Sequence, residues 1–167
     1  MSLSLYQISI PLFLRQLNTL SYLLKKGVKT HGQTSEQQQV LLDSRLIADM
    51  QALPYQIQRV SDSVKGVAVR LGGAEPESWA DDETTFEQLQ ERIAKTIAFI
   101  EKLEPTCMDG KEGVVVEFAS YKFPAKEYIL NFALPNFFFH FTMAYALLRK
   151  EGVPVGKKDY LGAGEPL

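Results

Sequence analysis

The feature that most constrains the fold of this chain is the spacing of its apolar residues, which recur every three or four positions over long stretches. This spacing places apolar side chains on one face of an α-helix. Long stretches of this kind are found at residues 3–24, 42–71, 86–103 and 134–148. They predict an all-α protein in which the helices bury these faces against one another as a four-helix bundle.

Prolines and capping residues predict where the first helices begin and end. Pro11 either kinks the first helix or starts its regular part, and Gly27 is expected to end it. Thr34 and Ser35 are each followed three residues later by Gln, the spacing of a capping box, so a second helix should start near Ser35. An unbroken helix from there to residue 71 would be about 55 Å long, which is too long for a domain of this size. We therefore expect a piece ending near Met50 and another from Pro54 to Leu71.

The second half of the chain has a less uniform pattern. A capping box at residues 84–87 predicts a helix that continues to Leu103. Between Asp109 and Pro124 a run of β-branched and aromatic residues lies between glycines, which predicts a small β-hairpin. A short helix over residues 125–131 and a last helix over residues 134–151 should follow. The last helix has Pro135 in its first turn and Gly152 at its C-terminal cap, and the remaining residues are expected to form a loop.

Composition narrows the class of protein. With 167 residues, 46% of them apolar and 23% charged, residues 1–167 fit one globular domain. A net charge of −2 and the lack of any long basic run argue against nucleic-acid binding. The single Cys107 excludes an internal disulfide, and the N-terminus shows no basic region with a cleavage site, so we expect a cytoplasmic location. Polar residues interrupt the apolar last helix, which argues against a membrane span.

His140 is the residue in most need of explanation, because it lies in a run of phenylalanines in the last helix. A buried imidazole must find hydrogen-bond partners, and a histidine satisfied within the core is the more common case. The alternative is a binding site, to which Asn136, four residues earlier, and Tyr145 would contribute. Both interpretations remain open from the sequence.

The second helical stretch supplies further candidates. Asp49 and Gln56 are seven residues apart, hence on one face, and Arg45 lies four residues before Asp49 at ion-pair spacing. A solvated surface pair is the simpler interpretation. In the functional interpretation, Asp49 lies near the break at Pro54 and contacts His140, where its carboxylate would favour the charged ring and burial would oppose it.

Three stretches resemble a known family: RLIADMQALPYQIQ, SDSVKGVAVRLGG and ALPNFFFHFTMAYALLRKEGVPVGKKDYLG. They are similar to a bacterial and fungal domain-of-unknown-function family in the DinB/YfiT-like superfamily. The resemblance covers nearly the whole chain. It implies an up-down-down-up four-helix bundle, often dimeric, with a small hairpin before the last helix. We expect a homodimer, also because the helices have more apolar faces than one core of this size needs.

The wider superfamily holds a divalent metal with three histidines, one on the second helix and an H-x3-H pair on the last, and some members act on thiol adducts. This chain has only two histidines, and Asn136 and Ala144 flank His140 at the relevant spacing. The leading hypothesis is a bundle with a degenerate metal site that binds a small molecule in an aromatic-lined pocket, without a cofactor. The alternatives are an enzyme with Zn, Ni or Mn held by His140 and Asp49, and a dimeric structural module without a ligand. The sequence does not identify the ligand or substrate.

Overall fold

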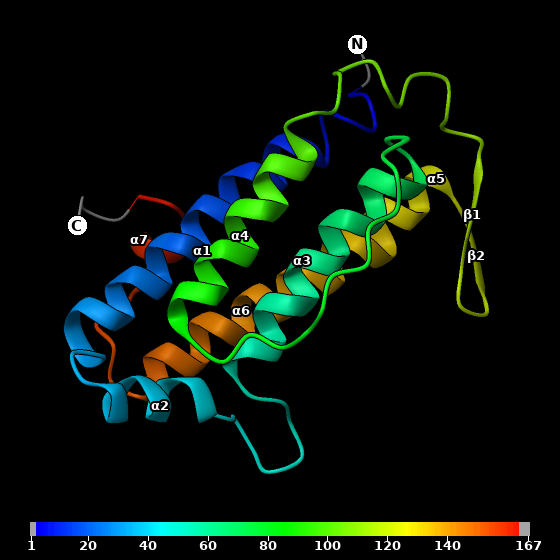
Figure 1. Ribbon diagram of the computed structural model, residues 1–167. Coiled ribbons are helices and arrows are strands. Elements are labelled where there is room, and N and C mark those ends of the chain that lie inside the picture. Colours follow the sequence, from blue (N-terminus) through cyan, green and yellow to red (C-terminus); the bar gives the residue numbers. More distant parts are fainter. Residues whose placement is uncertain (1–2, 164–167) are drawn as a thin grey trace.

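The computed structural model describes residues 3–163, and four long helices form the bundle (Figure 1). The elements are α1 (Ile10–His31), α2 (Ser35–Asp43), α3 (Leu53–Arg70), α4 (Phe86–Ile100), β1 (Val115–Phe118), β2 (Tyr121–Pro124), α5 (Ala125–Glu127), the π-helical segment η1 (Tyr128–Ala133), α6 (Leu134–Lys150) and α7 (Lys157–Tyr160). In Figure 1, α3 and α4 run in one direction and α1 and α6 in the other. The predicted up-down-down-up bundle is confirmed.

The core lies between the four long helices and is rich in aromatic rings. Phe13 of α1 contacts Phe137 of α6 with ring centroids 4.9 Å apart, and Phe137 stacks on Phe141 at 6.0 Å. All three side chains are fully buried. None of the helices between residues 3 and 163 is both long enough and apolar enough to cross a membrane.

Helix α1 begins at Ile10 with Pro11 in its first turn, so the proline starts the regular helix and does not kink it. The predicted end at Gly27 is wrong, because the helix continues to His31. Gly27 instead lies at a close approach of two helices: a Cβ atom there would lie 3.2 Å from Cδ2 of Leu148 on α6. A glycine within a helix can therefore mark tight packing as well as a helix end.

Helix α2 begins as predicted. Thr34 accepts a hydrogen bond from the Gln37 backbone, and the Gln37 side chain accepts from the Thr34 backbone in return. The predicted extension to Met50 is wrong, because the helix ends at Asp43 and residues 44–52 form a loop that projects from one end of the bundle (Figure 1). Leu46 and Ile47 are 50% and 61% exposed there, so their helical spacing had no core to pack against.

Helix α3 begins at Leu53, next to the predicted start at Pro54. Helix α4 begins at Phe86 behind a capping box formed by Thr85 and Gln88, one residue later than the predicted box at residues 84–87. Helix α4 ends at Ile100, three residues before the predicted end, and turns follow. Because α3 and α4 are parallel, the chain must return along the length of the bundle between them. Residues 73–85, which we call the strap, make this return without helix or strand (Figure 1).

The strap is held to the bundle by the buried guanidinium of Arg92 on α4, a residue that is 4% exposed. Its Nη1 donates to the Ala80 carbonyl at 2.8 Å and to Glu83 Oε1 at 2.9 Å. Its Nη2 donates to Asp81 Oδ1 at 3.1 Å, and its Nε donates to Ser61 Oγ on α3 at 3.0 Å. One side chain therefore joins both parallel helices to the strap.

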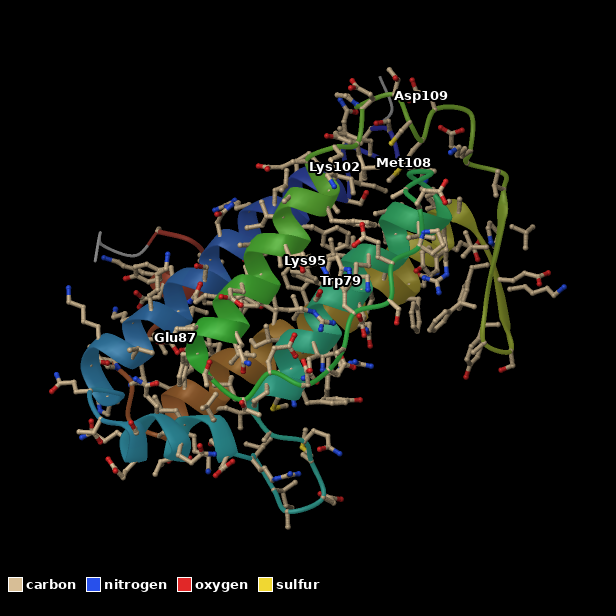
Figure 2. All side chains as sticks on the ribbon, in the orientation of Figure 1. Trp79, Glu87, Lys95, Lys102, Met108 and Asp109 are labelled. Carbon is tan, nitrogen blue, oxygen red and sulfur yellow. The ribbon has the colours of Figure 1, made fainter. Side chains whose placement is uncertain are left out.

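Trp79 fixes the middle of the strap. Its ring lies edge-on to Phe99 of α4, with centroids 5.6 Å apart. The ammonium groups of Lys65 and Lys95 lie 4.0 and 4.3 Å from its centroid, and Figure 2 shows Trp79 and Lys95 adjacent between strap and α4. These cation–π contacts add to the apolar burial of the indole.

The predicted hairpin is confirmed: β1 and β2 pair in antiparallel register, with Val116 opposite Phe123. The predicted break before the last helix is wrong, because α5, η1 and α6 follow one another without interruption. Pro135 explains the π-helical segment. It lacks an N–H and its ring clashes with the carbonyl four residues earlier, so the preceding turn widens, and the Leu134 N–H bonds to Ile129 five residues back.

Residues 153–163 are more ordered than predicted. Gly152 adopts φ +92° just after α6, which supports its predicted capping role. The expected loop contains the short helix α7, and residues 164–167 lie outside the described part of the chain. Asp159 of α7 accepts from Lys26 at 2.7 Å and from Tyr22 at 2.9 Å, and so ties α7 to α1. Burial alone would raise the pKa of Asp159, but hydrogen bonds from Lys26, the Gly156 N–H and Tyr22 lower it.

We predict that Arg92→Met will lower the free energy of unfolding by about 3 kcal/mol, because it leaves the Asp81 and Glu83 carboxylates without their shared cation. Urea denaturation of both proteins measures the difference. Lys95→Met, one turn further along α4 at an exposed position, is the matched control and should cost less than about 1 kcal/mol. Equal losses in the two variants would contradict a central role for Arg92.

Candidate functional site

A cleft of about 580 Å³ lies between α3 on one side and η1 and α6 on the other. Two stripes of side chains form its walls, spaced mostly at four residues along each helix. On α3 the stripe consists of Tyr55, Arg59, Ser63, Gly66 and Arg70, and on η1 and α6 it consists of Tyr128, Phe132, Asn136 and His140. Phe118 of the hairpin and Glu77 of the strap also line the cleft.

Three polar pairs connect the two walls. The helices α3 and α6 are antiparallel, so residues from the start of α3 pair with residues further along α6, and residues from the end of α3 pair with residues that precede α6 (Figure 1). The pairs are Gln56 with His140 (2.8 Å), Ser63 with Asn136 (2.7 Å) and Arg70 with Tyr128 (3.2 Å). The cleft therefore has an imidazole at one end and a guanidinium at the other, with a neutral pair between them.

The hydrogen bonds of Gln56 fix the position of the proton on His140. Nε2 of Gln56 donates to the Gln51 carbonyl at 2.9 Å, so the amide presents its Oε1 to the ring. Because Oε1 can only accept, Nδ1 of the neutral His140 must carry the proton and donate. The lone pair of the ring is then on Nε2, which forms no hydrogen bond with the residues that the structure describes, and His140 lines the cleft.

The environment of His140 keeps its ring neutral. Burial, and then the positive charge of Arg59, lower the pKa of His140 to about 4. Tyr55 and Phe139 lie edge-on to the ring, with centroids 5.9 and 5.1 Å away. At neutral pH this histidine is therefore an uncharged hydrogen-bond acceptor in a partly apolar setting.

The three basic side chains of the cleft differ in how far their charge is neutralised. Arg59 forms ion pairs with Asp62 at 2.9 Å and with Asp81 of the strap. Nζ of Lys65 lies 4.0 Å from Asp62 and over the Trp79 ring, and burial lowers the pKa of this ammonium group. Arg70 has no carboxylate within 4.0 Å among residues 3–163.

The structure brings together three of the six residues that the sequence singled out. Gln56 bonds to His140, and Asn136 lines the same cleft one turn away. The predicted contact between Asp49 and His140 is not formed, because Asp49 lies exposed in the loop after α2 and the partner of the ring is Gln56.

The other two predicted residues lie away from the cleft. Nη1 of Arg45 donates to the Met50 carbonyl at 2.7 Å, within the exposed loop, and forms no pair with Asp49. Tyr145 packs edge-on against Tyr160 of α7, with centroids 5.5 Å apart. This contact packs α6 against α7.

Sequence reasoning missed Arg59, Gly66, Arg70 and Tyr128. A usable signal was present on α3, where Arg59, Ser63, Gly66 and Arg70 follow one another at steps of four, three and four. This is a second stripe beside the apolar one, and it has a glycine inside an otherwise regular helical pattern, which indicates a packing or functional reason.

The donor groups of the cleft do not fit the three-histidine metal site that the resemblance implies. The His140 ring bonds to the amide of Gln56 on α3, and an amide, Asn136, stands four residues before it on α6, whereas first-row metals of the zinc type prefer imidazole and thiolate ligands. Within residues 3–163, His, Cys, Asp and Glu side chains form no group of three that could hold a metal ion.

Comparison with known proteins supports the resemblance inferred from the sequence. A family model described as "Domain of unknown function (DUF1993)" matches residues 5–161. The crystal structure of a DinB family member protein from Shewanella denitrificans is also similar, with a TM-score of 0.87 and 34% sequence identity. That match covers 98% of this chain and 94% of the other. No curated protein matches the chain.

We predict that His140 makes stability fall in acid. Between its ordinary pKa of 6.5 and its folded pKa of about 4, only the unfolded chain binds the proton, so the free energy of unfolding should decrease as the pH falls through this window. Chemical denaturation of the wild type and of His140→Gln across the window gives the contribution as a difference. A difference that does not change with pH would contradict the low pKa.

Proposed function

Because the chain belongs to the DUF1993 family and has the DinB-like fold, we propose that it binds a small organic molecule in the cleft between α3 and α6. In this proposal, Nε2 of His140 accepts a hydrogen bond from the ligand. The observation that supports it best is the fixed tautomer. The Gln51 carbonyl orients Gln56, Gln56 orients the ring, and the lone pair is left on Nε2, which forms no hydrogen bond with residues 3–163.

The walls of the cleft suit a ligand with an aromatic or apolar body. Tyr55 and Phe132 contribute rings, and Val69 and Ala133 contribute aliphatic surface. A volume of about 580 Å³ is in the ordinary range for small-molecule sites. Such sites combine apolar walls with a few oriented polar groups, and this cleft has that combination.

The two alternative functions have less support. An enzyme that uses a divalent metal would need donors that the surroundings of His140 do not supply, since amides stand where imidazoles are required. A purely structural module would have no need of an uncharged, oriented imidazole at the edge of a cleft.

We predict that phenol, an aromatic molecule with one O–H donor, will shift the ¹⁵N resonance of His140 Nε2 in a titration followed by NMR. Anisole, which has the same ring but no donor, should leave this resonance nearly unchanged, and His31 serves as an internal reference outside the cleft. Gln56→Met removes the acceptor for Nδ1–H, and should weaken the response because the proton can then move to Nε2. If phenol leaves Nε2 unmoved, or anisole moves it equally, the proposed contact does not exist.

We also propose that the chain forms a homodimer. Several apolar side chains remain open to solvent, among them Phe139 of α6 (54% exposed), Leu130 of η1 (43%) and Tyr55 of α3 (38%). Light scattering should return about twice the chain mass of 18.8 kDa, and Phe139→Glu should return a single chain mass. A wild-type mass of one chain at micromolar concentration would contradict the dimer.

A further inference from the structure

Gly66 occupies an interior position of α3, where glycine costs helix stability relative to alanine. Its φ angle is an ordinary helical one, so the backbone does not require glycine there. Space is what requires it: a Cβ atom at Gly66 would lie 2.5 Å from Nη1 of Arg70 and 3.0 Å from the hydroxyl of Tyr128. The absence of a side chain at Gly66 therefore makes room for the pair that Arg70 and Tyr128 form.

Arg70 is an exposed residue, and its guanidinium contacts two aromatic side chains. Nη1 donates to the Tyr128 hydroxyl at 3.2 Å, and the guanidinium carbon lies 4.6 Å from the Phe118 ring centroid and 5.8 Å from that of Tyr128. Burial raises the pKa of Tyr128, so its hydroxyl keeps its proton. Since that oxygen accepts from Arg70, its own hydrogen remains available as a donor.

The positive charge at this end of the cleft has no negative partner within the described residues, whereas Arg59 and Arg92 are each paired with carboxylates. Of the two acids in the lining, Glu77 accepts a hydrogen bond from Trp79 Nε1 at 2.8 Å, and Asp62 pairs with Arg59 and Arg92. A guanidinium that is open to solvent, positioned by these contacts and without a carboxylate partner is suited to receive an anion from outside the chain.

We propose that Arg70 and the Tyr128 hydroxyl bind the carboxylate of a monoanionic ligand, and that Gly66 exists to seat the guanidinium for this contact. The inference rests on the proposed function and specifies its ligand class. One uncompensated cation matches a single negative charge, and the planar fork of N–H donors matches a carboxylate. Phe118 and Phe132, with ring centroids 5.0 Å apart, flank this end of the cleft and favour a flat apolar group next to the carboxylate.

The experiment is a titration with benzoate and with benzamide, its neutral isostere, followed by the NMR signal of the Arg70 side-chain Nε–H. Benzoate should shift this signal saturably, and benzamide should bind about tenfold more weakly. Arg70→Met should weaken benzoate binding by about tenfold, read from backbone amide shifts along the cleft. Arg149→Met removes the same charge from an exposed position near the far end of α6, and should leave the affinity unchanged.

Gly66→Ala tests the space that seats the guanidinium. The added methyl group displaces the flexible end of Arg70, so benzoate binding should weaken by about tenfold. The methyl group would also lie 3.0 Å from the hydroxyl of buried Tyr128, so the melting temperature is measured alongside to establish that the variant is folded during the titration. Full benzoate affinity in Gly66→Ala or in Arg70→Met would overturn the proposal, as would equal binding of benzamide or no shift at Arg70 with benzoate.

The outcomes for the two proposals are distinguishable. If benzoate fails at Arg70 while phenol still moves His140 Nε2, the cleft binds small molecules but does not recognise a carboxylate. If benzoate binds at Arg70 while phenol leaves His140 unmoved, the carboxylate site exists and the proposed role of the histidine fails.

Discussion

The parallel arrangement of α3 and α4 is the constraint on which the rest of the structure depends. It requires a connection that crosses the length of the bundle with no helix or sheet to satisfy its polar groups (Figure 1). The buried guanidinium of Arg92 supplies what the backbone lacks, since it bonds to a strap carbonyl and to strap carboxylates at once. A buried cation is costly when unpaired, so strap and helix stabilise each other only when both are in place.

The same network determines the electrostatics of the cleft. Asp81 of the strap pairs with both Arg92 and Arg59, and Asp62 of α3 does likewise. These carboxylates form ion pairs with the guanidinium groups of Arg59 and Arg92. Arg59 lies at the end of the cleft that holds the neutral imidazole of His140. No such acid reaches Arg70 at the hairpin end, among the residues described. The two ends of the cleft therefore differ in charge: the arginine at the His140 end is paired with carboxylates, and the arginine at the hairpin end is not. The strap, which lies mostly outside the cleft, supplies part of this difference through Asp81.

Local signals in the sequence were sufficient for most of the fold, because they act within a few residues. Capping boxes start α2 and α4 through hydrogen bonds between near neighbours, at Thr34 as predicted and at Thr85 one residue after the predicted position. The hairpin follows from strand-forming residues between glycines. The extension of α2 failed because the spacing of Leu46 does not reveal whether a core lies opposite. The predicted contact between Asp49 and His140 failed for a similar reason. The hydrogen-bond partner of the ring depends on the register between α3 and α6, which is set by tertiary packing and not by local sequence.

The wide turn before Pro135 has a geometric consequence for the cleft. Each residue of an α-helix rotates the chain by about 100°, so a step of four overshoots a full turn by about 40°. Over the three steps from Tyr128 to His140, a regular helix would carry the tyrosine about 120° away from the histidine's face. A π-helical turn contains more residues than an α-helical turn, so a step of four residues in η1 rotates the chain by less than a full turn. This smaller rotation in η1 offsets the extra rotation that accumulates in the α-helical part. The proline thus sets the helical phase that lets one continuous helix present Tyr128 and His140 to the same partner.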